Sequence, residues 1–213
     1  NCSNLTSFII NDNSELISIG SLAFGLTNIK TLNIPFNFET FEEMSLFEMN
    51  ELQQITISPL NKKFKYIENK YLICKSEIEN DVYDTLVFCS KKVDKFDIPL
   101  GIQHISPYSF EKCSKIKEID FNNYSTLLTI GEKAFYKCTS IKRINFSPFI
   151  TSFQFSNFDN CKLLEHTTFP SSIQTIKRYA FYTCNKLKSV IFLENSQLKT
   201  IEEFAFQECT SLE

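Results

Sequence analysis

The chain has 213 residues, of which 43% are hydrophobic, and a formal net charge of −3. This length and apolar content allow a continuous core, whereas a weakly acidic chain without a basic stripe gives no electrostatic reason to expect nucleic-acid binding. No run of about 18 apolar residues occurs, so the sequence contains no transmembrane segment of the helical kind.

One motif accounts for most of the chain. Residues 130–146 read Ile-x-x-x-Ala-Phe-x-x-Cys-x-x-Ile-x-x-Ile-x-Phe, and residues 176–192 repeat the pattern with Leu and Val at two of the isoleucine positions. The marker phenylalanine of each copy is Phe24, Phe47, Phe110, Phe135, Phe158, Phe181 or Phe206. Adjacent markers lie 23 or 25 residues apart, except for one gap of 63. A motif that recurs at such a period predicts a solenoid of stacked coils.

Each copy also contains a short run of alternating apolar residues, which predicts a strand with one buried face. These runs are residues 5–10, 29–34, 52–57, 116–121, 141–146, 164–169 and 187–192. Stacked coils would place the strands side by side, about 4.8 Å apart, in one parallel sheet. The marker phenylalanines then lie on the return leg of each coil, and we expect them in the core.

Residues 58–92 interrupt the repeat, and we interpret them as an irregular coil. Residues 70–74 and 85–89 are two β-prone runs on either side of a polar stretch, which predicts a hairpin with a long tip. The strand pattern resumes over residues 93–99. Cys74 and Cys89 fall on the two predicted hairpin strands, where a cross-strand disulfide and two unpaired thiols both remain open.

Six of the eight cysteines occupy one position of the repeat. They are Cys2, Cys113, Cys138, Cys161, Cys184 and Cys209. Free cysteine behaves as a small buried apolar residue, whereas a disulfide requires a specific geometry between two chains. We therefore expect a ladder of buried thiols, with disulfides as the alternative.

The repeat predicts one elongated body, because the chain has only 4 Gly and 6 Pro and contains no flexible linker. Residues 2–8 match residues 113–119, so the chain starts inside a repeat, and it stops inside another after Cys209. Solenoids end in repeats with a polar outer face, and neither end has one. We expect residues 1–213 to form a single solenoid segment that is truncated mid-repeat at both ends.

The repeat resembles the BspA-like, Treponema-type leucine-rich repeat, including the proline that follows the strand at Pro35, Pro99 and Pro170. The resemblance covers nearly the whole chain, but Thr27 and Asn50 stand where the family pattern has cysteine. It implies an α/β-type repeat solenoid that is mainly β, with one parallel sheet of stacked 23–25-residue coils and one irregular coil carrying a hairpin. It also implies a cell-surface or extracellular location and adhesion to host proteins, and the composition is typical of a parasitic protist.

The sequence offers no set of residues with the spacing of an active site. It lacks the phosphate-binding, zinc-protease and serine-hydrolase motifs, and it has no Cys-x-x-Cys pair that would hold zinc. His104 and His166 are the only histidines, and neither is near a cysteine that we expect to be exposed. We therefore predict no catalytic, metal or cofactor site, and no enzyme activity.

The open face of the predicted sheet, formed by its outward-facing side chains, is the better candidate for a site. Its charged centre consists of Lys95, Asp97, Glu118, Asp120, Arg143 and His166. Solenoids often bind partners on such extended surfaces, so we predict contact there with a protein or a glycan. The alternative is a solvated face, because binding hot spots usually contain Trp, Tyr or Arg. The acidic hairpin tip, residues 77–84, is the competing site.

Four Asn-x-Ser/Thr sequons begin at Asn1, Asn4, Asn123 and Asn145. In a eukaryotic secretory pathway such sequons accept glycans, and the candidates for modification are Asn4, Asn123 and Asn145. A glycan on Asn145 would cover the open face.

The sequence therefore predicts a non-enzymatic binding module of a surface protein, which recognises a protein or a glycan and takes part in host-cell adhesion. The alternative is a structural spacer, or a cytoplasmic scaffold repeat, that has no tight ligand.

Overall fold

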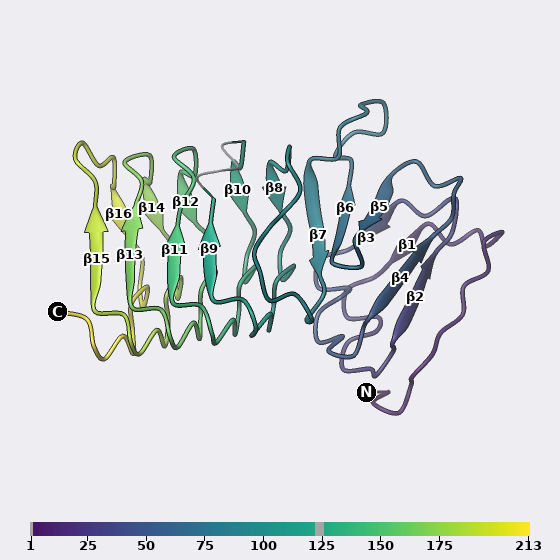
Figure 1. The fold of residues 1–213 in the computed structure, drawn as a ribbon, viewed down its shortest axis with the longest axis horizontal. Coiled ribbons are helices and arrows are strands. Elements are labelled where there is room, and N and C mark those ends of the chain that lie inside the picture. Colours follow the sequence, from purple (N-terminus) through teal and green to yellow (C-terminus); the bar gives the residue numbers. More distant parts are fainter. Residues whose placement is uncertain (1, 122–125) are drawn as a thin grey trace.

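The computed structural model describes residues 2–121 and 126–213, and these form a β-solenoid with no helix among them. Figure 1 shows the coils stacked along the long axis, with the C-terminal coil at one end. The strands are β1 Ser18–Ile19, β2 Thr31–Ile34, β3 Thr40–Phe41, β4 Gln54–Ile57, β5 Phe64–Ile67, β6 Tyr71–Cys74, β7 Thr85–Cys89, β8 His104–Ile105, β9 Glu118–Asp120, β10 Thr129–Ile130, β11 Arg143–Asn145, β12 Ser152–Phe153, β13 His166–Phe169, β14 Thr175–Ile176, β15 Ser189–Phe192 and β16 Thr200–Ile201. The prediction of a mainly β repeat solenoid is confirmed.

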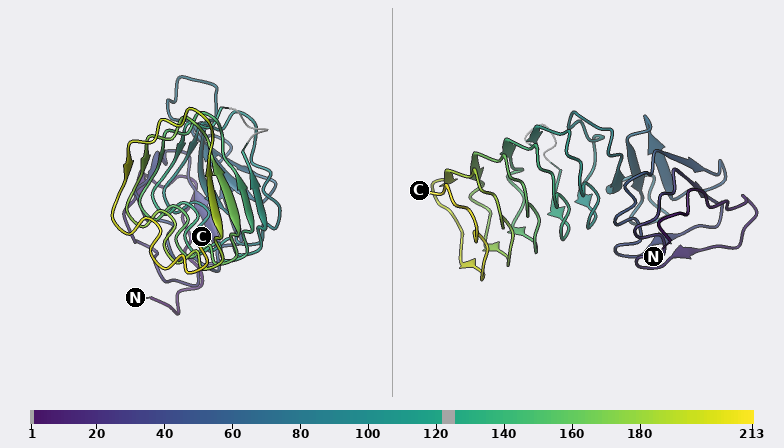
Figure 2. Two further views of the ribbon diagram at one scale, coloured as in Figure 1. Left: turned by 90° about the vertical axis from the view of Figure 1, so that its left-hand side faces the viewer. Right: turned by 90° about the horizontal axis from the view of Figure 1, so that it is seen from below.

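The C-terminal coils are the most regular part of the molecule. Their strands β9, β11, β13 and β15 form a parallel four-stranded sheet, and each strand comes from a different coil. A second series of two-residue strands runs along the opposite side of the coils, where β12, β14 and β16 form another parallel sheet (Figure 2, left). We did not predict this second series, because two residues are too few to show an alternating pattern.

The marker phenylalanines of the regular coils stack into a column through the core. Phe110 and Phe135 have ring centroids 4.8 Å apart with ring planes 17° apart, and Phe135 and Phe158 are 5.3 Å apart at 7°. The column continues through Phe181 to Phe206 at spacings of 5.3 and 5.5 Å. Aromatic pairs prefer such offset contacts over a centred sandwich. The column lies within a core cluster that extends from residue 71 to residue 209.

The predicted thiol ladder runs beside this column. The Cys138 Sγ lies 3.0 Å from the carbonyl oxygen of Phe110, the marker phenylalanine of the previous coil. Each following thiol contacts the carbonyl of the marker phenylalanine one coil earlier in the same way. These further contacts join Cys161 to Phe135, Cys184 to Phe158 and Cys209 to Phe181, at 3.6, 3.3 and 3.1 Å. All eight cysteines are free. Cys2 is exposed and thus lies outside the buried ladder.

The irregular coil divides the core into two clusters. Strands β5, β6 and β7 pair antiparallel, and β7 then pairs parallel with β8 of the next coil. Tyr71 and Ile73 of β6 belong to the C-terminal cluster, whereas Leu72 belongs to a separate N-terminal cluster. Because successive side chains of a strand point to opposite faces, β6 is buried on both sides and forms a wall between the two cores.

The turns on the return legs of the coils before and after the irregular coil nevertheless contact each other directly. Phe47 packs edge-on against Tyr108, with ring centroids 4.8 Å apart, although the two residues lie on opposite sides of the irregular coil in the sequence. In the regular coils the turn amide of Lys112 donates to the Tyr136 carbonyl at 2.8 Å. At the junction, the equivalent amide of Glu48 donates instead to the Glu111 carboxylate, at 3.2 Å.

Lys91 explains this exchange of partners. Its ammonium group donates to the Glu111 carbonyl oxygen and thereby occupies the acceptor that Glu48 would use in a regular coil. The Glu111 side chain is fully buried, and its other oxygen lies 3.6 Å from the Lys112 ammonium. Lys112 also pairs with Glu48. The buried carboxylate therefore connects the two turns in place of the backbone bond that joins regular coils.

Three local expectations need correction. Residues 5–10 and 93–98 contain no strand, so the predicted sheet begins only at β2 and is interrupted between β4 and β9. Cys74 and Cys89 do lie on the predicted hairpin, but the register pairs Cys74 with Thr85 and Cys89 with Tyr71. The two thiols are therefore at opposite ends of the hairpin, which rules out a disulfide between them.

We predict that Phe135→Ala lowers the free energy of unfolding by about 3 to 5 kcal/mol, the usual cost of removing a buried aromatic ring. Phe135 has no exposed surface and stacks on a ring from each neighbouring coil. Urea unfolding followed by circular dichroism measures the change. Phe149→Ala is the control, because Phe149 is 52% exposed and should lose little stability. Equal urea midpoints for the two variants would show that the column does not stabilise the fold.

We predict that Glu111→Ala lowers the free energy of unfolding by about 2 to 4 kcal/mol, because it leaves the Glu48 amide without its acceptor and removes one of the two carboxylates that pair with Lys112. Glu111→Gln keeps an acceptor oxygen and should cost less than half as much. Gln207→Ala, which changes the equivalent but exposed position of the last coil, should be nearly neutral. The idea of a connecting carboxylate fails if the Ala and Gln variants of Glu111 unfold at the same urea concentration.

Candidate functional site

The open face carried by β9, β11, β13 and β15 presents two rows of side chains that cross the coils. The pairing register sets the first row as Glu118, Arg143, His166 and Ser189. It sets the second row as Asp120, Asn145, Thr168 and Ile191. Neighbours in such a row are about one strand spacing apart, roughly 4.8 Å. The first row therefore brings a carboxylate, a guanidinium and an imidazole from three coils onto one line.

The charged groups of the first row are accessible. Glu118, Arg143 and His166 are all exposed. The His166 Nδ1 lies 2.9 Å from the Ser189 hydroxyl, which orients the imidazole along the row. Among the described residues, no ion pair within 4.0 Å joins Arg143 to Glu118. A ligand that carries both signs of charge can therefore contact these groups without first breaking a bridge between them.

Lys95 and Asp97 were predicted to extend these rows, and the structure does not place them in the sheet. The Asp97 carboxylate accepts hydrogen bonds from the Tyr71 hydroxyl at 2.8 Å and the Lys70 ammonium at 3.2 Å. These bonds hold residues 93–98 against β6, and this segment itself forms no strand. Lys95 is exposed but lies outside the four-stranded sheet. The candidate surface is therefore narrower than the sequence predicted, and begins at β9.

The hairpin tip projects beyond the ends of the strands (Figure 1). Its base is held by the Ser76 hydroxyl, which donates to the Asp84 carboxylate at 2.6 Å, and by Lys75, which pairs with Asp81 at 3.0 Å. The carboxylates of Asp81 and Asp84 are thus already engaged within the tip. This internal pairing makes the tip a weaker candidate for charged contacts than the first row of the open face.

The structure places two of the three candidate glycosylation sites. Asn4 is exposed, and Asn145 is half-buried in the second row of the open face. Asn123 and the further sequon at Asn1 lie outside the described residues. Whether any sequon carries a glycan stays a prediction.

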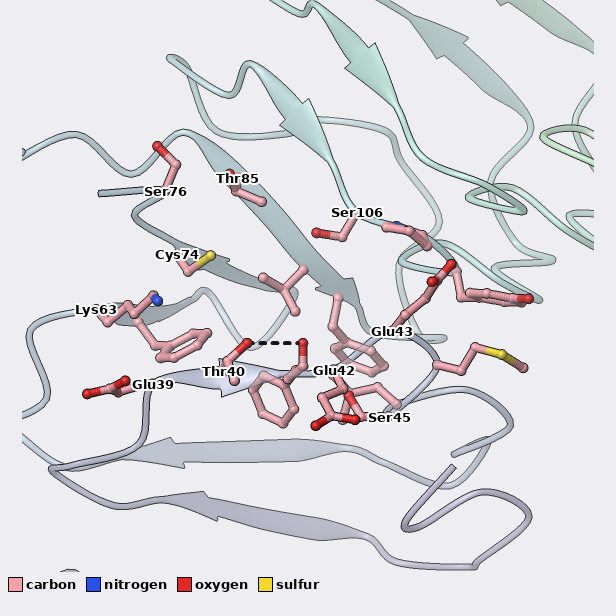
Figure 3. A pocket seen from close by; sticks show the side chains of 18 of the residues that line it. Glu39, Thr40, Glu42, Glu43, Ser45, Lys63, Cys74, Ser76, Thr85 and Ser106 are labelled. Atoms are coloured by element: carbon pink, nitrogen blue, oxygen red, sulfur yellow. Dashed lines mark hydrogen bonds between the residues drawn. The ribbon is translucent and has the colours of Figure 1, made fainter. Parts of the chain in front are cut away.

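The structure also contains a cleft that the sequence did not predict. A cleft of about 410 Å³ separates β3 and the turn that follows it from the ends of β6 and β7 (Figure 3). We call it the junction cleft; its lining includes Glu39, Thr40, Phe41, Glu43, Val87 and Ser106. No motif signals it, because its walls come from segments that are distant in the sequence and that only the irregular coil brings together.

Cys161 and Cys74 have the properties of structural thiols. Burial raises the pKa of Cys161, and burial also raises the pKa of Cys74, at the edge of the junction cleft, to about 11. Such thiols stay protonated at neutral pH and are poor nucleophiles. In the described parts of the chain, no group of three or more His, Cys, Asp or Glu residues is arranged to hold a metal ion. The same residues include no apolar helix of membrane-spanning length.

The sequence matches one family over its whole length. The family description is "BspA type Leucine rich repeat region", and it matches six copies over residues 1–85 and 82–213. A search of the curated proteins finds no significant match.

Solved structures with a similar fold come from bacteria. A leucine rich cell surface protein of Faecalibacterium prausnitzii is 26% identical over 95% of this chain and 51% of its own, with a TM-score of 0.82. The pneumococcal vaccine antigen PcpA is 19% identical over 93% of this chain and 51% of its own, with a TM-score of 0.79. A leucine rich repeat protein of T. pallidum is 25% identical over 60% of each chain, with a TM-score of 0.54. The chain thus spans about half the length of the first two relatives.

We predict that a maleimide labels the native protein at Cys2 at once, at Cys74 slowly, and at Cys113, Cys138, Cys161 and Cys184 only after unfolding. The first is exposed and the last four have no exposed surface. Peptide mass spectrometry after timed labelling, with and without urea, reads each site separately. Fast labelling of the ladder thiols in the absence of urea would contradict their burial. Failure to label in urea would show that they are oxidised.

Proposed function

Because the chain belongs to the BspA-type leucine-rich repeat family, we propose that it is a non-enzymatic recognition module that binds a protein or a glycan at a cell surface. The observation that carries the proposal is the first row of the open face. In that row Glu118, Arg143 and His166 are exposed and aligned across three coils. The surface location is supported by the description of the F. prausnitzii relative as a cell surface protein.

The chemistry of the row suits a polar ligand. A carboxylate accepts hydrogen bonds from sugar hydroxyls or lysine side chains, and a guanidinium donates to carboxylates in a fixed planar geometry. Charged groups of this kind set specificity and association rate more than total affinity. Because they are exposed, their contribution should fall as ionic strength rises.

The repeat architecture also favours recognition of an extended ligand. Each coil adds one outward side chain to each row, so that a ligand running across the strands meets a new residue at about every 4.8 Å. The marker phenylalanines and ladder thiols are fixed by the core, whereas the outward positions are free to differ from coil to coil. A sequence of differing outward residues on a constant scaffold is how solenoid proteins build binding surfaces. Adhesion to host cells is the biological role that we propose for such a surface.

We predict that a Glu118→Lys/Asp120→Lys variant loses binding to intact host-type cells, measured by flow cytometry with the fluorescently labelled chain. Wild-type binding should weaken between 50 and 300 mM NaCl, because added salt screens the attraction between exposed charges on the chain and on its ligand. A glycan array and a surface-protein array would then separate the two ligand classes.

The matched comparison is a tip variant, in which residues 77–82 are replaced by Asn-Gly to give a short hairpin turn. This variant leaves the open face intact and should bind as the wild type does. If the tip variant alone loses binding, the hairpin tip is the contact surface and the open-face assignment is wrong. If neither the wild type nor any variant binds cells or arrays, the spacer interpretation replaces the binding module.

A further inference from the structure

We propose that the junction cleft binds an extended peptide that carries basic residues beside apolar ones, and that this peptide adds as a strand to the outer edge of β3. The site is separate from the open face, so the inference goes beyond the proposed function. It rests on three features of the described residues: an edge strand, an apolar floor and an acidic wall.

The edge strand is the first feature. Among the described residues β3 pairs with β1 on one side only, in a two-stranded sheet. The amide of Thr40 donates towards β1, to the Ile17 carbonyl at 3.1 Å. Alternate residues of a parallel strand direct their amide and carbonyl groups to opposite edges, so those of Phe41 point towards the cleft. The Phe41 carbonyl accepts a long bond of 3.4 Å from the Thr40 hydroxyl (Figure 3), which a peptide amide can replace with a shorter one.

The geometry of the neighbouring coil leaves this edge open. In the regular part of the molecule the return-leg strands β12, β14 and β16 pair in succession from coil to coil, although β10 does not pair with β12. After β3 the next coil turns away, because its strand β5 pairs antiparallel with β6 instead. The irregular coil therefore deprives β3 of the neighbour that the repeat would supply, and the cleft occupies that place. Unpaired strand edges bind extended peptides by main-chain hydrogen bonds.

The floor of the cleft is apolar and only partly covered. Phe41, Leu46 and Val87 line it, and each packs against the N-terminal core while remaining partly accessible. Side chains on one face of an added strand would rest on this floor. The cleft volume of about 410 Å³ lies within the range of roughly 300 to 1,000 Å³ that is usual for ligand sites.

The charge of the walls selects the peptide. Glu39 and Glu43 are exposed on the β3 side, and Figure 3 shows them towards opposite ends of the cleft. On the other wall the Lys75 ammonium is already paired with Asp81 at 3.0 Å. Lys63 is the other lysine of the lining, and it stands against three glutamates, Glu39, Glu42 and Glu43, so the lining keeps an excess of negative charge. A bound strand with a lysine or arginine near each end would meet these two carboxylates, whereas an acidic strand would be repelled.

The test uses the peptide acetyl-Val-Lys-Val-Lys-Val-amide as the probe and the chain of residues 1–213 as the receptor, with affinity measured by isothermal titration calorimetry. We expect saturable binding at low salt, at least tenfold weaker binding when glutamate replaces both lysines of the probe, and at least tenfold weaker binding to Glu39→Lys/Glu43→Lys. The matched control Glu51→Lys/Glu194→Lys makes the same change in net charge at two exposed positions away from the cleft and should bind as the wild type does.

Strand addition has its own test, because only alternate amides of an added strand face its partner. Two further probes carry N-methyl groups on the valine amides or on the lysine amides. One should bind at least tenfold more weakly than the unmodified probe, and the other should bind almost equally well. Equal binding by both would overturn strand addition, and equal binding by the acidic probe or absence of any binding would overturn the site itself. These outcomes are independent of the Glu118→Lys/Asp120→Lys variant, which leaves the cleft unchanged.

Discussion

Stacking of the marker phenylalanines is the interaction on which the regular part of the solenoid depends. The five rings from Phe110 to Phe206 lie at centroid spacings of 4.8 to 5.5 Å, close to the roughly 4.8 Å between hydrogen-bonded strands. Ring stacking and backbone pairing therefore favour the same rise per coil. Because a single coil has no partner for its ring, each coil depends on its neighbours, and stability is shared along the stack. The thiol ladder fits the same rise, since each thiol contacts a carbonyl one coil away.

The irregular coil is where this constraint is relaxed. Phe110 ends the column on its N-terminal side, where Phe96 and Tyr71 approach its ring in tilted orientations instead of stacking on it. Strand β6 then separates the two cores, while Glu111 and Lys91 connect the return turns across the gap. The molecule thus remains continuous on its turn side while its sheets are interrupted. A buried carboxylate suits this role, because its side chain reaches further than the backbone carbonyl that it replaces.

The sequence predicted the buried positions of the repeat and the single hairpin, but it missed the short return-leg strands and the contacts made within the irregular coil. Recurrence identified the coil, the buried position of Phe135 and the thiol ladder, because the same residue type in successive copies must meet its own copies. It misplaced Asp97, whose pattern is that of a strand residue but whose carboxylate bonds to Tyr71 of the inserted hairpin. Cys74 and Cys89 each stand at the C-terminal end of their strand, so the antiparallel pairing of β6 with β7 alone places them at opposite ends of the hairpin. The junction cleft was missed because its walls meet only through tertiary packing.

Two kinds of surface follow from this difference between repeated and unrepeated structure. The open face is built by the period, so that each additional coil would lengthen its rows and a changed outward residue would alter them without touching the core. The junction cleft is built by the failure of the period at one place, so that its shape depends on the hairpin and on the edge that β3 retains. Substitutions on the open face therefore leave the cleft unchanged, whereas a change in the hairpin alters the cleft and the contact between the two cores together. Recognition on the open face can therefore change without cost to the rest of the structure, whereas a change that reshapes the cleft also affects how the two cores meet.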